Sequence, residues 1–137
     1  MSWSPSGEWL AAWPTDTAYI YLLQPDRGLI LRIDEAAAVG IASLHWNPQS
    51  TSLLVNLQYG MGIKLWSLKS SASGALLKQP MHLFPYPKNG AGQLLDFSAD
   101  GLVMAILHRR DGVDHIAIYT TSDWHVITVA PRSKIFN

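Results

Sequence analysis

The hydrophobic residues of this chain fall in short runs separated by polar turns. The clearest example lies between Leu94 and Val129, where four apolar runs of four to six residues alternate with turns rich in Asp, Gly and Ser. Runs of this length are typical of strands, and tight turns between them favour antiparallel pairing of neighbours. The pattern therefore predicts a four-stranded antiparallel meander. Its strands are expected at Leu94–Phe97, Leu102–Leu107, His115–Tyr119 and Trp124–Val129.

This pattern occurs two more times along the chain. An aromatic residue followed by a four-residue turn stands at Trp3, Trp46 and Phe97, at spacings of 43 and 51 residues. A second aromatic residue ends the third predicted strand of each copy, at Tyr21, Trp66 and Tyr119. Two aromatic positions that recur in phase are typical of β-propeller blades of the WD-repeat kind. We therefore predict an all-β chain of about three four-stranded antiparallel blades, a WD-repeat-like β-propeller fragment with units at 1–40, 41–92 and 93–137.

The first two units follow the same plan with local differences. Strands of the first unit are expected at Trp9–Trp13, Thr17–Leu23 and Leu29–Ile33, after a first strand that has few residues available before Ser4. Strands of the second unit are expected at Ile41–Trp46, Ser52–Gln58 and Gly62–Leu68. Residues 34–40 are interpreted as a link between blades. Lys69–Gly74 has the composition of a flexible linker, and such insertions often lie on the binding face of repeat folds.

The composition of the chain restricts the possible functions more than it restricts the possible folds. Ten basic residues balance ten acidic ones, so the chain has no excess of positive charge that would attract nucleic acid or an anionic membrane. Cysteine is absent, which excludes disulfides and thiolate chemistry. No run approaches the ~20 apolar residues of a membrane span, and the first residues do not resemble a signal peptide. We expect a soluble intracellular protein without nucleic-acid or membrane partners.

The motifs of common catalytic and metal sites are missing. There is no Gly-x-Ser-x-Gly elbow, no P-loop and no His-Glu-x-x-His sequence. His108 and His115 flank one predicted turn, where Asp111 or Asp114 would supply further metal ligands. Ordinary surface histidines are the favoured interpretation, because no additional ligand stands at a fixed spacing. We predict no catalytic residues, no cofactor and no metal, and therefore no enzyme.

Arg109, Arg110 and Asp111 form the most distinctive cluster of polar residues and are the candidate partner-binding residues. One interpretation is a solvated hairpin turn. The other is an ion-pairing turn that either fixes the neighbouring blade or receives an acidic segment of a partner, since arginine is suited to bidentate contact with carboxylates. The sequence alone leaves both interpretations open.

Three fragments carry a more specific signal. They are IDEAAAVGIASLHW with WSL at Trp66–Leu68, YPK at Tyr86–Lys88, and F-x-x-DG-x-x-MA-x-x-x-RRD-x-x-D-x-x-x-IY-x-x-x-DW from Phe97 to Trp124. In these fragments the chain resembles the centrosomal and spindle-pole family of WD-repeat proteins. The Trp-Asp dipeptide is replaced by Trp66-Ser67 and no Gly-His pair occurs, so the buried hydrogen-bond network of ordinary WD repeats is not expected.

The resemblance implies a protein-interaction scaffold of the cytoplasm and cytoskeleton, located at the centrosome or spindle pole. It would help to anchor microtubule minus ends and organise the spindle. The implied partners are a microtubule-anchoring adaptor and a minus-end-directed kinesin. The alternative is the gating propeller of a prolyl-oligopeptidase-like hydrolase, because SWSPSGEWLAAW also resembles the Pro-Asp-Gly repeats of those enzymes.

The repeat also predicts a core and two open ends. Residues at matching strand positions are expected to be buried: Trp46, Leu54, Trp66, Phe97, Met104, Ile118 and Tyr119. Trp9 and Trp13 are expected to be exposed if the first blade is incomplete. Propellers close with about four to eight blades, so three cannot form a ring. The apolar faces of the first and last blades therefore favour self-association or insolubility of the chain on its own.

Overall fold

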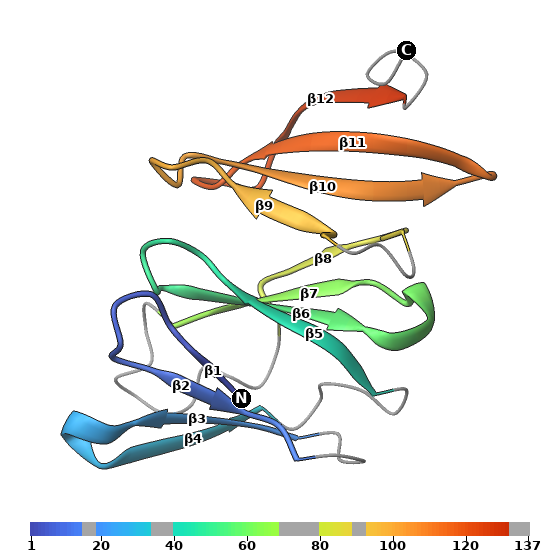
Figure 1. The fold of residues 1–137 in the computed structure, drawn as a ribbon. Helices are drawn as coiled ribbons and strands as arrows, with labels where there is room; N and C mark the ends of the chain where they lie inside the picture. Colours follow the sequence, from blue (N-terminus) through green and yellow to red (C-terminus); the bar gives the residue numbers. More distant parts are fainter. Residues whose placement is uncertain (15–18, 34–39, 69–79, 89–92, 132–137) are drawn as a thin grey trace.

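The computed structural model describes residues 1–14, 19–33, 40–68, 80–88 and 93–131. Three four-stranded antiparallel sheets lie one above another, face to face, as Figure 1 shows. The first blade contains β1 (Ser2–Trp3), β2 (Leu10–Ala12), β3 (Ile20–Gln24) and β4 (Leu29–Ile33). The second contains β5 (Ile41–Trp46), β6 (Ser52–Leu57), β7 (Ile63–Ser67) and β8 (His82–Phe84). The third contains β9 (Leu95–Phe97), β10 (Val103–Arg110), β11 (Val113–Thr120) and β12 (Val126–Pro131).

In each blade every strand pairs with its neighbour in the chain, so the predicted all-β meanders are confirmed. Among the described residues, the remaining regular structure consists of two single 3₁₀ turns, η1 (Pro25–Arg27) and η2 (Gln58–Gly60). In the described part of the chain, no helix is long and apolar enough to cross a membrane. Residues 34–39 of the expected link between blades and the linker Lys69–Gly74 lie outside the described residues.

Two strand predictions need correction. No fourth strand is predicted for the second blade, yet β8 forms between Pro80 and Pro85 and pairs with β7. Proline is tolerated beside such a short edge strand because no ladder hydrogen bond is required of it there. The expected turn from Arg109 to Asp114 is also mostly strand. Only Asp111 and Gly112 form the turn, with φ of 53° and 75°, as in the two-residue turns that Asp-Gly favours.

The first turn of each blade is built in the same way. Its first residue is Ser4, Asn47 or Ser98, and the side-chain oxygen accepts a hydrogen bond from the backbone N–H five residues later, at 3.0, 2.8 and 3.2 Å. Its fourth residue has positive φ, at Gly7, Ser50 and Gly101. These hydrogen bonds therefore help to fix the angle between the first and second strands of each blade.

Neighbouring turns are also joined across the junctions between blades. The Ser6 N–H donates to Ser50 Oγ at 2.9 Å, and Gln49 Nε2 donates to the Asp100 carbonyl oxygen at 3.2 Å. A third contact runs from Trp46 Nε1 to the Ser2 carbonyl oxygen, at 3.3 Å. These bonds help to set the register of one blade on the next.

The core is divided between two junctions, because successive strand residues point to opposite faces. In β6, Leu53, Val55 and Leu57 pack against the first blade, whereas Leu54 packs against the third. The first-blade side of the lower junction is formed by Trp9, Ala11, Ile20, Leu22, Leu31 and Ile33. The upper junction combines Leu54, Ile63, Leu65 and Phe84 with Leu94, Leu95, Met104, Ile106 and Trp124. The middle blade is thus buried on both faces.

The burial prediction is confirmed for Leu54, Trp66 and Met104, which are fully buried. Trp46, Phe97 and Tyr119 are only half-buried, because each lies near the end of its strand and packs at the margin of a junction. Ile118 is half-buried for a different reason, since it lies on the outer face of the third blade.

Exposure of Trp9 was expected only for an incomplete first blade, and this blade has all four strands. Trp9 is 5% exposed, because its strand packs against the second blade, and Trp13 is half-buried against the same cluster. Trp66 has a buried indole N–H without a hydrogen-bond partner among the described residues, in keeping with the absence of the usual WD network.

Candidate interaction site between the second and third blades

The segment Pro85–Lys88 crosses from the second blade to the third and pairs with the end of β10. The Lys88 N–H donates to the Leu107 carbonyl oxygen at 3.0 Å, and the Arg109 N–H donates to the Tyr86 carbonyl oxygen at 2.9 Å. Pro87 and His108 form a bridge between them. β9 pairs with β10 only from Met104 to Ile106, so the second half of β10 is available to this crossing segment.

A buried carboxylate ties the crossing segment to the hairpin of β10 and β11. Asp114 Oδ2 lies 2.8 Å from Lys88 Nζ, and Asp114 Oδ1 lies 2.8 Å from Arg109 Nε. The Asp114 side chain is 2% exposed, so it needs these two cations to offset its desolvation. The hydrogen bond from Lys88, and after it the bond and charge of Arg109, lower the pKa of Asp114 despite the opposing effect of burial. We call Lys88, Arg109 and Asp114 the clasp.

The three predicted partner-binding residues have different surroundings. Arg109 belongs to the clasp, so its ion pair fixes the crossing segment. Arg110 points to the other face of β10, where its guanidinium lies 5.1 Å from the ring centroid of Tyr86. Asp111 is exposed at the tip of the hairpin. Arg110 and Asp111 are therefore accessible to a partner, whereas the ion pair with Asp114 holds Arg109 in place.

A hollow of about 290 Å³ opens beside Arg110. It is lined by Pro85, Tyr86, His108, Arg110, His115, Ala117, Tyr119 and Val129. Two aromatic rings, one guanidinium and two imidazoles thus surround an otherwise apolar floor. Such a mixture suits a peptide segment with an acidic residue next to an apolar or aromatic one.

His108 is held in one tautomer by its surroundings. Its Nδ1 lies 2.7 Å from the Pro85 carbonyl oxygen, which can only accept, so Nδ1 carries the hydrogen. Its Nε2 lies 3.1 Å from Tyr119 Oη. Burial lowers the pKa of His108, with a smaller contribution from His115, against the raising effect of the Pro85 and Tyr86 carbonyl groups. The imidazole is therefore neutral near pH 7, and its Nε2 accepts the Tyr119 hydroxyl, whose pKa is raised by burial.

Three of the four residues considered for a metal, His108, His115 and Asp114, are engaged in other contacts. Both ring nitrogens of His108 are bonded, His115 Nδ1 lies 3.0 Å from the Val113 carbonyl oxygen, and Asp114 is held by the clasp. Within the described ranges, no group of three or more His, Cys, Asp or Glu residues is arranged to hold a metal ion.

A second hollow, of about 460 Å³, lies between the same two blades at the opposite end. Most of its lining residues carry a hydroxyl or amide group, among them Asn47, Thr51, Thr121 and Ser122. Much of this polarity is used internally: the Asn47 amide donates to Thr51 Oγ1 at 2.8 Å, and Thr121 Oγ1 donates to the Gly101 carbonyl oxygen at 2.6 Å. This hollow has no charged residue in its lining and offers less to a charged partner.

A comparison with known protein families finds no matching family description. The mouse protein described as WD repeat-containing protein WRAP73 is 28% identical to the chain over 126 residues, which cover 84% of this chain and 25% of that protein. Among solved structures, a eukaryotic initiation factor superposes with a TM-score of 0.67 at 18% identity, covering 93% of this chain and 31% of the other.

Two further solved structures share the fold. Kuenenia stuttgartiensis hydrazine synthase has a TM-score of 0.61 at 12% identity, over 94% of this chain and 35% of its own. A 6-phosphogluconolactonase homologue from Bacteroides uniformis has a TM-score of 0.61 at 17% identity, over 91% and 37%. The chain is three blades of a WD-like β-propeller. The similarity to WRAP73 supports a WD-repeat family, whereas the solved structures support the fold alone. The chain spans about a quarter of the curated relative.

The resemblance to prolyl-oligopeptidase-like propellers rests on one feature of the WD-like repeat. The turn at Ser4–Gly7 has the same hydrogen bonds as the turns that begin at Asn47 and Ser98. It is therefore a property of all three blades.

Sequence reasoning missed Lys88 and Asp114 as members of the site. A signal was present, since YPK and RRD-x-x-D stand in two separate fragments of the family resemblance. The structure brings these fragments together in the clasp.

Proposed function

We propose that this chain is a non-catalytic protein-interaction platform that acts at centrosomes and spindle poles. Together with a microtubule-anchoring adaptor and a minus-end-directed kinesin, it would help to anchor microtubule minus ends and organise the spindle. One observation carries the proposal: the segments that distinguish the resembling family from other WD repeats, YPK and RRD-x-x-D, converge on one structured site. The similarity to a WD repeat-containing protein supports the scaffold reading.

The binding surface in this proposal is the rim formed by Tyr86, Arg110 and Asp111 together with the adjacent hollow. Arg110 is exposed and its guanidinium can form paired hydrogen bonds with a carboxylate of the adaptor. Tyr86 is 52% exposed and provides a flat apolar surface beside that charge. Arg109 contributes indirectly, because its ion pair with Asp114 positions the strand that carries Arg110.

Binding of the purified adaptor to the wild-type chain and to Arg110→Glu, measured by titration calorimetry, tests the proposal. We expect the substitution to weaken binding about tenfold or more, because it replaces an attraction to an acidic segment with a repulsion. Arg27→Glu is the matched control, since Arg27 is exposed in η1 of the first blade and the change in charge is the same.

The circular dichroism of both variants should match that of the wild type. Equal affinities for wild type, Arg110→Glu and Arg27→Glu would move the contact away from this rim. Absence of any binding to the adaptor would reject the spindle-pole assignment itself.

A further inference from the structure

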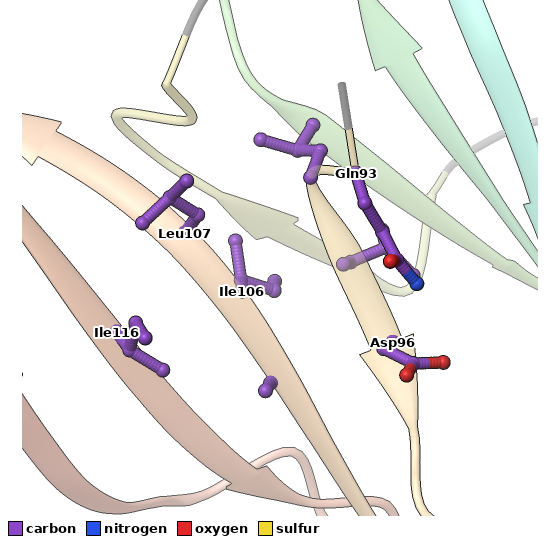
Figure 2. Close-up of a pocket in the computed structure, with 8 residues that line it drawn as sticks. Gln93, Asp96, Ile106, Leu107 and Ile116 are labelled. Carbon is purple, nitrogen blue, oxygen red and sulfur yellow. The ribbon is translucent and has the colours of Figure 1, made fainter. Parts of the chain in front are cut away.

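The hollow beside Arg110 differs in charge from two other hollows of the second and third blades. Its walls include the Arg110 guanidinium and the imidazoles of His108 and His115, and no described carboxylate is part of its lining. The hollow of about 460 Å³ at the opposite end has no basic residue in its lining. Figure 2 shows a third hollow, of about 250 Å³, where Gln93 and Asp96 lie beside apolar side chains of β10 and β11, again without a basic residue. An anionic ligand is therefore expected beside Arg110 and not at the other two.

The walls of this hollow are held by contacts within the protein. His108 and Arg110 are two residues apart and share one face of β10. His115 lies directly opposite His108 in the ladder and brings β11 to the same face. Behind them, the ring of Tyr119 packs edge-on against Phe84 of β8, with 4.9 Å between the ring centroids. The hollow is therefore formed before any ligand arrives.

Tyr86 stands beside Arg110 in an unusual backbone conformation. Its φ is 57°, in the left-handed region that residues other than glycine rarely adopt. The Tyr86 carbonyl oxygen accepts the Arg109 N–H at 2.9 Å and lies 3.2 Å from His108 Nδ1, and these contacts hold the conformation. Residues strained in this way are common at ligand-binding sites. Here the strain places an aromatic ring 5.1 Å from the Arg110 guanidinium.

The size and the floor of the hollow indicate what it can hold. Ala117 and Val129 lie opposite each other in the ladder and provide an apolar surface together with Pro85. The volume of about 290 Å³ is at the lower limit of the about 300–1,000 Å³ that small-molecule pockets occupy. The hollow therefore suits one large side chain. That side chain needs an apolar body for the floor and a negatively charged end for Arg110.

We propose that this hollow binds a phosphotyrosine of a partner protein. The aromatic ring would lie on Ala117 and Val129 beside the ring of Tyr86, and the phosphate would contact Arg110. A phosphate has about −1.5 to −2 charges and three acceptor oxygens, so it can accept paired N–H groups of a guanidinium and one further donor. His115 is available for that contact, because among the described residues none bonds to its Nε2. Glutamate has the charge without the ring, and tyrosine has the ring without the charge.

The phosphotyrosine is assigned here to the partner of the proposed function, and to that extent the inference rests on that function. It would be the acidic residue that contacts Arg110. Because phosphorylation is reversible, a tyrosine kinase would create the binding site on the partner and a phosphatase would remove it. The interaction would then be switched without any change in this chain.

Titration calorimetry of the wild-type chain with the end-blocked peptide Ala-Ala-phosphotyrosine-Ala-Ala tests the site. Two comparison peptides carry tyrosine or phosphoserine at the centre. We expect the phosphotyrosine peptide to bind at least about tenfold more tightly than either, because each comparison peptide lacks one of the two contacts. Arg110→Gln removes the cation, and Val129→Glu adds a negative charge to the floor at a position that is 53% exposed. Each should weaken the phosphotyrosine peptide about tenfold or more, and the control Arg27→Gln should not.

Several results would overturn the proposal. The first is equal affinity for the phosphotyrosine and tyrosine peptides, or no binding at millimolar concentration. Equal affinity for the phosphoserine peptide would show that the ring is not recognised. Adenosine monophosphate also combines an aromatic ring with a phosphate, and binding of this nucleotide as tight as that of the phosphotyrosine peptide would indicate a nucleotide site. Unchanged peptide binding by Arg110→Gln and Val129→Glu, with wild-type circular dichroism, would place the peptide elsewhere.

The purified adaptor distinguishes this proposal from the proposed function. Adaptor that has been treated with a tyrosine kinase should lose affinity for the chain after phosphatase treatment. An adaptor that binds equally in both forms and still depends on Arg110 would support the proposed function and reject the phosphotyrosine. A chain that binds the phosphotyrosine peptide but not the adaptor would support the site and reject the spindle-pole assignment.

Discussion

Leu53 and Leu54 of β6 are adjacent in sequence and should be equally important for stability. Leu53 is fully buried against the first blade and Leu54 is fully buried against the third. In an antiparallel sheet with one solvated face, one of two such neighbours would be exposed and its truncation would cost little. Because both are enclosed here, Leu53→Ala and Leu54→Ala should each lower the free energy of unfolding by about 2–5 kcal/mol.

Urea unfolding followed by tryptophan fluorescence measures this loss, with all proteins at one concentration so that any association affects them equally. The control is Leu102→Ala, because Leu102 is 65% exposed, and its free energy of unfolding should stay within about 0.5 kcal/mol of the wild type. A loss of 2–5 kcal/mol is a large part of the about 5–15 kcal/mol that stabilises a typical domain. A wild-type midpoint for either leucine variant would refute the stacking of blades on both faces of β6.

The remaining predictions concern one turn and two titrating groups. Ser50 has φ of 59° where the other blades have glycine, and its hydroxyl accepts the Ser6 N–H. Ser50→Ala should therefore lose about 1–2 kcal/mol and Ser50→Gly less, as compared by thermal unfolding; equal losses would show that the strained backbone is unimportant. The lowered pKa of Asp114 means that its carboxylate stabilises the fold fully above the ordinary value of 3.8, and that this contribution disappears as pH falls through the lower folded-state value. Asp114→Asn should flatten this acid limb, and an unchanged slope would contradict the clasp. Burial likewise lowers the pKa of His108 below its ordinary value of 6.5, so stability should decline as pH falls below 6.5, because the unfolded chain binds the proton first; His108→Gln should remove this part of the pH dependence.

The blade plan was predictable because it depends on local signals that recur. The aromatic residues at Trp3, Trp46 and Phe97 each precede a turn whose polar side chain closes on the next strand. Short β8 was missed, because a strand of three residues, His82–Phe84, gives no periodicity. The extension of β10 and β11 as far as Arg110 and Val113 was missed, because charged residues there do not resemble a strand. The dipeptide Asp111-Gly112 nevertheless indicated the correct turn.

The site was predictable only in part, because its geometry depends on distant residues. Arg109 was recognised as an ion-pairing candidate, but its partner Asp114 was not expected to be buried. That burial depends on Lys88, which lies 26 residues away and reaches the carboxylate only because the crossing segment joins β10. The burial of Ile118 was overestimated for a similar reason. A position in the repeat determines which face of the sheet its side chain points to, but not whether another blade covers that face.

The enclosure of the middle blade also bears on how the molecule opens and forms. Hydrogen bonds of β6 and β7 have a sheet on each side, as Figure 1 shows, so their amide protons should exchange with solvent only when a junction separates. Exchange should become faster toward β1 and β12, which are edge strands of the first and third sheets. Since each strand pairs with its chain neighbour, most pairings are local and form early, which favours rapid folding for an all-β protein. We expect the slow event to be the docking of preformed hairpins on the second blade, because both junctions meet there.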